Sequence, residues 1–168
     1  MRRLYFIRHG LSVNNIEGKL SGTTDTPLTD IGREQALIAG RTAKKLSIDT
    51  IISSPLSRAT ETAEIIASQL SYPNDKIIVN KLFIERNFGP YEGQPYGITR
   101  LSNAPGVETV DEIIERAKKS LNYINNLDAE TVLVVSHGAF GRALRFLTLN
   151  LEYDHPEQFQ NAKIVRLI

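Results

Sequence analysis

Residues 4–10 read Leu4-Tyr5-Phe6-Ile7-Arg8-His9-Gly10, an apolar run that stops abruptly at a cation, an imidazole and a glycine. A short apolar run of this kind predicts a buried strand. In an open α/β sheet, groups at the carboxyl ends of the strands face the ligand crevice. The pair Arg8-His9 therefore indicates a site for an anion and a nucleophile or base. A surface arginine and histidine that simply follow a strand would give the same sequence pattern.

Two later segments repeat this arrangement. Residues 131–135 are apolar throughout apart from the first threonine, which predicts a parallel strand covered on both faces, and Ser136-His137-Gly138 follows directly. A third strand is predicted over residues 50–53, and Arg58 then falls in the first turn of the next helix. Helix N-termini bind anions and disfavour an unpaired cation, so Arg58 is a candidate ligand for an anion.

The remaining periodicity completes an alternating βα pattern. Helices are predicted over residues 29–46, 57–70, 108–125 and 138–147, and further strands over 76–79 and 163–167, the last at a sheet edge. Residues 11–27 are predicted to be a polar loop and residues 82–106 an irregular segment that covers the crevice. The predicted fold is α/β, an open, mostly parallel sheet with helices on both faces, in one domain spanning 1–168.

Composition narrows the classes of protein. The 168 residues are 41% hydrophobic and 23% charged with a net charge of +1, which gives no reason to expect nucleic-acid or membrane-surface binding. The absence of cysteine excludes disulfides, thiolate catalysis and cysteine metal sites. No signal peptide or membrane span is evident, so we expect a cytoplasmic protein. The sequence leaves the oligomeric state open, with a homodimer as one option.

If the sheet is parallel, the three strand ends bring two arginines and two histidines into one crevice. This set suits a phosphate, because guanidinium groups match phosphate oxygens and stay charged. It suits a metal poorly, since the arginines would repel the ion and a zinc site needs three or four ligands where this set offers two histidines. We therefore predict no metal and no cofactor.

The chain resembles the histidine phosphatase superfamily, also called phosphoglycerate mutase-like. The matching motifs occur in the family's order and cover nearly the whole chain. They are Arg8-His9-Gly10, Pro27-Leu28-Thr29 with Gly32, Gln35 and Ala36, Ser53 to Ala63, Phe88-Gly89 with Tyr91-Glu92-Gly93, and Val135-Ser136-His137-Gly138.

The resemblance implies a role for each matching position. His9 would be the nucleophile that forms a phosphohistidine, and Glu85 would protonate the leaving oxygen and later activate water. The phosphoryl oxygens would be held by Arg8, Asn15, Arg58, His137 and the N–H of Gly138. Ser21 and Gly22 match substrate-contacting positions of the mutase branch. Glu92, a second acid near Glu85, more often shapes the loop in this family.

Elementary chemistry adds three expectations. Neighbouring arginines should lower the pKa of His9 and keep this nucleophile neutral. A ring N–H bonded to a backbone carbonyl, with Gly10 as the candidate, would fix its tautomer. His137 would work best protonated, sharing its charge with the phosphoryl oxygens.

The resemblance leaves three activities to weigh. Only residues 94–106 separate the Glu85 segment from the next helix, and they carry one cation, Arg100, whereas true mutases have a large basic insertion there. The sequence therefore favours a metal-independent hydrolase of a small phosphomonoester. A cofactor-dependent phosphoglycerate mutase and a non-catalytic phosphate-binding module are the alternatives.

Four positions outside these motifs carry weaker expectations. Arg86 and Arg100 could meet a second anionic group of the substrate, although solvated surface positions are preferred. His155 is predicted to lie on a surface turn. Many family members carry an acid or amide at the position of Leu11. We therefore expect the polar network of this loop, and with it the substrate preference, to differ from theirs.

Overall fold

The computed structural model describes residues 3–97, 101 and 104–168, and these residues form a five-stranded sheet. The strand order is β3-β2-β4-β1-β5, and β5 alone runs antiparallel, against β1. The strand bounds are β1 Arg3–Arg8, β2 Thr50–Ser53, β3 Ile78–Val79, β4 Thr131–Ser136 and β5 Ile164–Arg166. The predicted α/β fold with a mostly parallel, open sheet and a final edge strand is confirmed.

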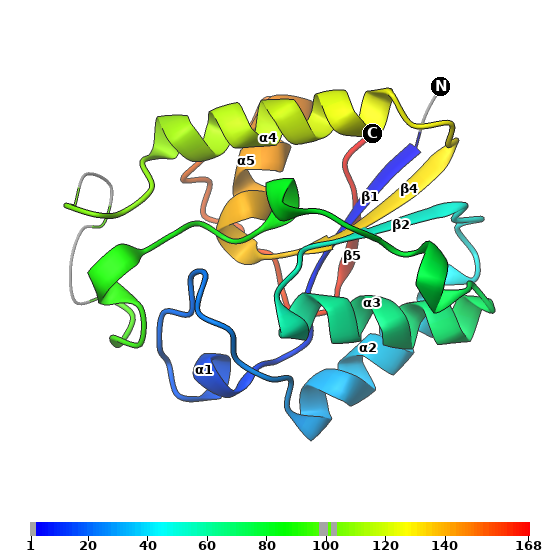
Figure 1. Ribbon diagram of the computed structural model, residues 1–168, viewed down its shortest axis with the longest axis horizontal. Helices are drawn as coiled ribbons and strands as arrows, with labels where there is room; N and C mark the ends of the chain where they lie inside the picture. The colour runs from blue at the N-terminus through cyan, green and yellow to red at the C-terminus, as the bar shows by residue number, and fades with distance from the viewer. Residues whose placement is uncertain (1–2, 98–100, 102–103) are drawn as a thin grey trace.

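Helices cover both faces of this sheet, with α2 and α3 on one side and α4 and α5 on the other (Figure 1). The bounds are α2 Asp30–Ala43, α3 Ser57–Leu70, α4 Val110–Asn125 and α5 Gly138–Leu149. Successive side chains of β1 point to opposite faces of the sheet, so the strand contributes to the core on each face. Leu4 and Phe6 pack in the core under α4 and α5, whereas Tyr5 and Ile7 pack under α2 and α3.

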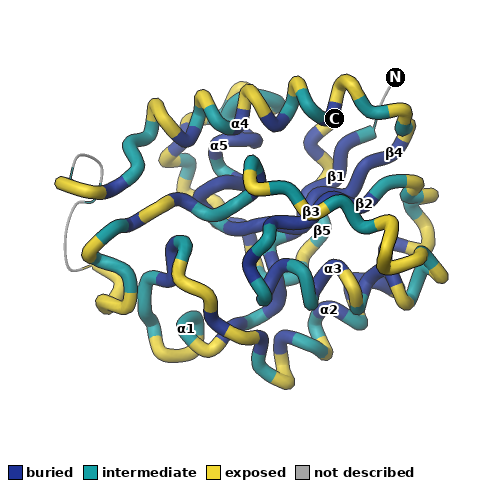
Figure 2. Tube along the Cα trace, in the orientation of Figure 1, coloured by how far each residue is buried: buried dark blue, intermediate teal, exposed yellow. Residues whose placement is uncertain are grey.

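Strand β4 lies at the centre of the sheet, and all six of its residues are buried (Figure 2). Val132 and Val134 face one core and Leu133 and Val135 face the other. A strand covered on both faces needs apolar residues at every position, which is why this run lacks the usual alternation. Its carboxyl end is thereby held rigidly beside that of β1.

The predicted boundaries differ from the structure at several places. The strand predicted over 76–79 shrinks to Ile78–Val79, because Asn74–Lys76 forms a 3-10 turn in which the Lys76 N–H bonds the carbonyl of Pro73. Helix α2 ends before residue 46, where i−3 bonds tighten the chain and Ser47 takes a φ of 51°. Within the predicted loop 11–27, Val13–Ile16 form the short helix α1.

Helix α4 begins at Val110, two residues after the predicted start at Glu108. Thr109 is its N-cap and forms a capping box with Glu112, which supplies partners for N–H groups that the helix leaves free. Glu108, the predicted first residue, instead pairs with Arg116 at 2.8 Å. This partly buried pair ties the residues just before α4 to its second turn.

The irregular segment after β3 crosses the sheet near the carboxyl ends of the strands (Figure 1). It contains two 3-10 turns, Lys81–Phe83 and Gly89–Tyr91. Phe83 is fully buried against Phe140, and the Ser136 hydroxyl donates to the Phe83 carbonyl at 2.6 Å. These contacts hold the segment against β4 and α5 although it lacks regular structure.

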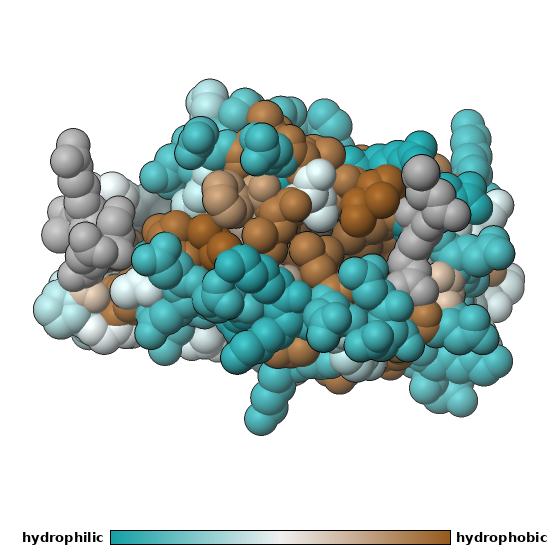
Figure 3. Space-filling model, turned by 90° about the horizontal axis from the view of Figure 1, so that it is seen from above, coloured by the Kyte–Doolittle hydropathy of each residue, from teal (hydrophilic) through white to brown (hydrophobic). Residues whose placement is uncertain are grey.

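The face that carries α4 and α5 shows a band of apolar side chains with hydrophilic ones on either side (Figure 3). Along α4, Ile114 and Leu121 pack against the core while keeping part of their surface exposed.

Among the described residues, no helix is both long and apolar enough to span a membrane.

Candidate active site

Three chain segments meet at the carboxyl edge of the sheet. His9 follows β1, His137 follows β4, and Arg58 begins α3 after β2. All three side chains are buried, the two imidazole centres lie 5.1 Å apart, and the Arg58 Nε–H donates to His9 Nε2 at 3.2 Å. The parallel sheet thus brings together the residues that the sequence singled out at three separate strand ends.

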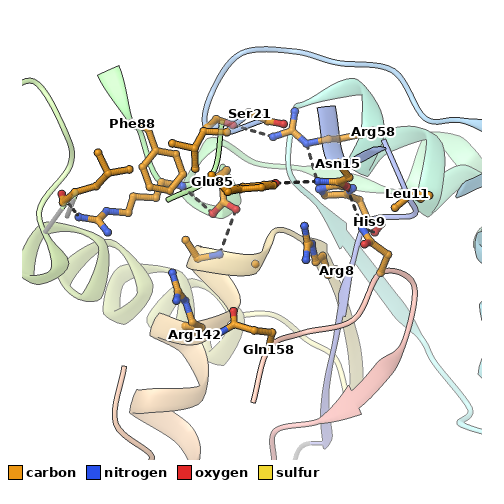
Figure 4. A pocket seen from close by; sticks show the side chains of 18 residues that line it. Arg8, His9, Leu11, Asn15, Ser21, Arg58, Glu85, Phe88, Arg142 and Gln158 are labelled. Carbon is orange, nitrogen blue, oxygen red and sulfur yellow. Dashed lines mark hydrogen bonds between the residues drawn. The ribbon is translucent and has the colours of Figure 1, made fainter. Parts of the chain in front are cut away.

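These groups border a cavity of about 590 Å³ (Figure 4). The cavity is lined by every residue of the predicted site except His137, which is fully buried next to His9. The lining members of that set are Arg8, His9, Asn15, Ser21, Gly22, Arg58, Glu85 and Gly138.

His9 is held in one orientation from both sides of its ring. Nδ1 lies 2.7 Å from the Gly10 carbonyl, so it carries the proton, and Nε2 accepts from Arg58. The expected carbonyl contact is therefore present. Gly10 needs to lack a side chain, because a Cβ there would lie 2.3 Å from the carbonyl oxygen of Gly32. Burial first, then Arg58 and Arg8, lower the pKa of His9 well below its ordinary value, which leaves a neutral nucleophile.

Arg58 is fully buried and bonded at each nitrogen. Besides its contact with His9, Nη1 donates to the Thr24 carbonyl at 2.9 Å and Nη2 to the Gly22 carbonyl at 2.8 Å. Burial lowers the pKa of Arg58, and Glu85 and Asp25 oppose this effect. The loop 22–24 thus aims the guanidinium at the nucleophile.

Glu92 shapes that loop, as expected. Its carboxylate accepts from the N–H groups of Thr23 at 2.9 Å, Thr24 at 2.8 Å and Phe88 at 3.1 Å. Burial favours the neutral form, but these bonds and the Thr24 hydroxyl outweigh it and lower the pKa of Glu92. Gly22 has a φ of 52°, and a Cβ there would collide with Glu92.

His137 is held by Ser54, whose Oγ lies 2.7 Å from Nε2. Its Nδ1 is buried and has no hydrogen-bond partner among the residues the structure describes. Burial, followed by Arg58, His9 and Arg8, lowers the pKa of His137 well below its ordinary value. The lowered pKa favours the neutral form of His137, whereas the protonated form was expected at work. A phosphoryl dianion would favour the protonated form.

Glu85 reaches the cavity from the irregular segment. Its carboxylate accepts from the N–H groups of Ala139 at 3.2 Å and Phe140 at 3.0 Å, at the first turn of α5 (Figure 4). Its backbone carbonyl accepts from Arg116, which also bonds the carbonyls of Leu82 and Ile84. Helix α5 and α4 together therefore fix an acid whose own segment is irregular.

Asn15 stands at the cavity wall within a small amide network. Its Oδ1 accepts from Asn161 at 3.2 Å and from the Ser12 N–H, while its Nδ2 donates to the Tyr96 hydroxyl. Leu11 has no polar side chain, but its N–H donates to Gln35 at 2.9 Å. The side-chain amide of Gln35, on α2, therefore accepts the hydrogen bond of the Leu11 backbone N–H.

One prediction for this region is wrong and another lies outside the described residues. Arg86, expected at the solvated surface, is 5% exposed and donates to the carbonyls of Glu108 and Leu101. Arg100 belongs to residues the structure does not describe. His155 lies partly exposed on a turn away from the cavity, where its Nδ1 accepts from the Glu157 N–H.

Sequence reasoning missed four residues that build this site. Arg142, Gln158 and Asn161 line the cavity, and Arg116 holds the Glu85 backbone. The spacing of Arg142, one helical turn after Gly138, was a usable signal, because residues four apart share a helix face. The others act across long sequence separations and leave no local pattern. Among the described residues, no group of three or more histidine, aspartate or glutamate side chains could hold a metal.

A profile of the histidine phosphatase superfamily, branch 1, matches residues 4–168. The chain belongs to this superfamily. The uncharacterized phosphatase PhoE of Bacillus subtilis is 35% identical over 98% of this chain and 84% of its own length. The probable phosphoglycerate mutase GpmB of Salmonella choleraesuis is 34% identical over 82% of this chain and 70% of its own. The structure of Bacillus stearothermophilus YhfR aligns with a TM-score of 0.88 at 26% identity, covering 99% and 90% of the two chains.

The resemblance drawn from the motifs is thereby confirmed. The protein is an enzyme of the phosphatase and mutase type, and a phosphomonoester substrate follows from the family.

Proposed function

We propose that the protein hydrolyses a small phosphomonoester through a phosphohistidine at His9, without a metal ion. The observation that carries the proposal is the fixed, neutral His9, whose Nδ1–H bonds Gly10 and whose Nε2 meets the Arg58 guanidinium. The Nε2 lone pair accepts from the Arg58 Nε–H, so attack on phosphorus requires this N–H to move from Nε2 to a phosphoryl oxygen, whose charge the same cation would then neutralise.

In the first step, Nε2 attacks phosphorus and the bond from phosphorus to the ester oxygen breaks. Glu85, protonated at the start, gives its proton to the leaving oxygen, so an alcohol departs. Arg8, Arg58, Asn15, His137 and the N–H of Gly138 would hold the phosphoryl oxygens, and His137 would gain a proton as negative charge arrives.

In the second step, water attacks the phosphohistidine. Glu85 takes a proton from the water, the bond between phosphorus and Nε2 breaks, and inorganic phosphate leaves. The position of Glu85 supports both roles, because its carboxylate lines the cavity and the N–H groups of Arg86, Ala139 and Phe140 hold its two oxygens in place.

The choice between hydrolysis and mutase activity rests on what covers the cavity. A mutase must shield its phosphohistidine from water until a second acceptor hydroxyl binds. Residues 94–106 form too short a segment for a large basic cover. This favours the phosphatase, and the mutase remains the second candidate because a relative named as a probable mutase is 34% identical.

The test is phosphate release from a panel of small phosphomonoesters with EDTA present, for the wild type and for His9→Ala and Glu85→Gln. We expect release that vanishes in His9→Ala. Glu85→Gln should lose more activity on alkyl phosphates than on p-nitrophenyl phosphate, whose leaving group needs no proton. Turnover that survives in His9→Ala would refute the phosphohistidine. Exchange between 2- and 3-phosphoglycerate without phosphate release would identify a mutase.

A further inference from the structure

The peptide group that joins His9 to Gly10 is held by a side chain at each end. Its carbonyl oxygen accepts from Asn161 Nδ2 at 2.9 Å, and its N–H donates to the Thr62 hydroxyl at 3.1 Å. Because a peptide group is planar, these two bonds fix the plane in which it lies. Thr62 belongs to α3, whereas Asn161 lies just before β5, so the tertiary fold brings the two bonds together.

The orientation of this peptide group matters for the nucleophile. The next carbonyl along the chain, that of Gly10, is the one that lies 2.7 Å from His9 Nδ1. A glycine has no side chain to restrict its own backbone angles. If the peptide group before Gly10 could rotate, the carbonyl after it would leave its place beside Nδ1, and the ring proton could move to Nε2. The bonds from Asn161 and Thr62 therefore help to keep Nε2 free of a proton for its attack on phosphorus.

The backbone around Asn161 is attached to the end of β1. Arg8 and Asn161 form an isolated parallel bridge, and the Ala162 N–H donates to the Arg8 carbonyl at 2.8 Å. Ala162 has a φ of 53°, in the left-handed region that is unfavourable for a residue with a Cβ. These contacts place the Asn161 side chain beside the residue that follows Arg8, which is His9.

Asn161 also contacts Asn15, the expected phosphate ligand. The Oδ1 atom of Asn15 accepts from Asn161 Nδ2 at 3.2 Å and from the Ser12 N–H at 3.2 Å. Since both donors meet the oxygen, the amide nitrogen lies on the other side, where it donates to the hydroxyl of Tyr96 in the cavity wall. An amide can donate to a phosphoryl oxygen only through its nitrogen. Asn161 thus helps to keep the donor end of Asn15 available to the cavity.

An amide is the side chain that fits these two contacts. The nitrogen of Asn161 carries two N–H groups, and the two atoms it meets, the His9 carbonyl oxygen and Asn15 Oδ1, can only accept. Aspartate would place an oxygen against both acceptors, and leucine would fill a similar volume without a donor. One residue therefore serves the nucleophile and a phosphate ligand at the same time.

We infer that Asn161 and Thr62 are positioning residues, which set the tautomer of His9 through the peptide group between His9 and Gly10, and that Asn161 also sets the amide orientation of Asn15. The inference rests on the proposed function for the roles of His9 and Asn15. Asn161 lines the cavity, but both of its N–H groups are bonded to these two residues, so it acts through them.

NMR of the imidazole ring nitrogens tests the tautomer in the free protein, without any turnover. The chain has three histidines, so His137→Asn and His155→Asn assign the signals of His9 by elimination. In the wild type at mildly alkaline pH, we expect Nδ1 of His9 to carry the proton and Nε2 to carry none.

Two variants should change this spectrum and two should not. In Asn161→Leu and Thr62→Val, each of which removes one bond to the peptide group, we expect the tautomer of His9 to shift toward Nε2–H. Thr62→Ser keeps the hydroxyl and should retain the wild-type tautomer. Asn122→Leu makes the same exchange at an exposed position of α4 and is the matched control.

Steady-state kinetics on p-nitrophenyl phosphate test the contact with Asn15. We expect Asn161→Leu to lower kcat/KM about 10²-fold, as for a misplaced reacting group. In an Asn15→Ala background its effect should shrink to about 10-fold, because the part that acts through Asn15 is already lost. Thr62→Val acts through His9 alone, so its effect should be the same in both backgrounds.

An unchanged His9 tautomer in both Asn161→Leu and Thr62→Val would overturn the role in positioning the nucleophile. An Asn161→Leu effect of equal size with and without Asn15 would overturn the role in orienting the amide. If Asn161→Leu does not fold, Asn161→Ala takes its place, since it needs no additional space.

The outcomes also separate this inference from the proposed function. A tautomer that depends on Asn161 and Thr62, in a protein that hydrolyses no ester, would contradict the phosphatase alone. Hydrolysis that requires His9, with a tautomer and a kcat/KM that stay unchanged in the Asn161 and Thr62 variants, would contradict the positioning role alone.

Discussion

The two ends of the cavity are built differently. At the phosphoryl end, His9, Arg58 and His137 are buried, come from the ends of two strands and the start of a helix, and contact one another. At the outer end, Phe88, Tyr96, Leu101 and Gln158 come from irregular segments, and Tyr96 is 51% exposed. The first region fixes the reaction, because charge stabilisation needs preorganised groups, and the second can vary with the leaving group.

The largest expected effect tests the rigidity of the phosphoryl end. Lysine at position 58 keeps the charge but cannot bond Nε2 of His9 and the carbonyls of Gly22 and Thr24 at once. We expect Arg58→Lys to lower kcat/KM about 10³-fold, in the range of arginines that stabilise phosphoryl transfer. Steady-state kinetics measure this, with Arg41→Lys as the control for the same exchange at an exposed site. A loss below tenfold would show that charge alone suffices.

A smaller effect is expected where a regular helix supports an irregular segment. Arg116 of α4 bonds the carbonyls of Leu82, Ile84 and Glu85, so Arg116→Met should misplace the acid. We expect kcat on alkyl phosphates to fall about 10- to 100-fold, as for a mispositioned general acid. The loss on p-nitrophenyl phosphate should be smaller, which separates mispositioning from a general loss of folded protein. Lys118→Met, exposed on the same helix, is the control, and equal losses on both esters would refute the positioning role.

The buried histidines make stability depend on pH. Burial first, and the neighbouring arginines next, lower the pKa of His9 and His137 below 6.5, so the unfolded chain binds more protons at mildly acid pH. The free energy of unfolding should therefore fall as the pH drops below about 6.5, by at most about 1.4 kcal/mol per pH unit for each histidine.

Urea unfolding between pH 7 and 5.5 measures this slope. The variants His9→Asn and His137→Asn should each reduce it, and His155→Asn is the control for removing a histidine from the surface turn. A slope unchanged in both buried-site variants would mean that other groups govern the acid sensitivity.

The smallest effect is expected at the outer end. Tyr96→Phe removes a hydroxyl that accepts from Asn15 at 3.3 Å in an exposed contact. Such a bond contributes little, so kcat/KM should change less than about threefold. A much larger loss in the same kinetic assay would show that the outer end also orients the phosphoryl group through Asn15, and would weaken the contrast between the two ends.

Much of the phosphoryl end could be predicted because it depends on short, continuous patterns. The apolar runs before His9 and His137 predict buried strands, and parallel strands align their carboxyl ends at one edge. The contact between His9 and the Gly10 carbonyl joins adjacent residues and was also predictable. Local propensity and backbone geometry act over a few residues, so the sequence carries this information directly.

The tertiary structure alone decided which residues support and surround that end. Arg86 looked like a surface residue, yet it is buried against carbonyls 15 and 22 positions away. Arg116 holds a segment more than 30 residues distant, and Gln158 reaches a cavity whose nucleophile is residue 9. A polar side chain looks alike in sequence whether water or a distant carbonyl accepts its hydrogen bonds. Only the packed fold determines which of the two it meets.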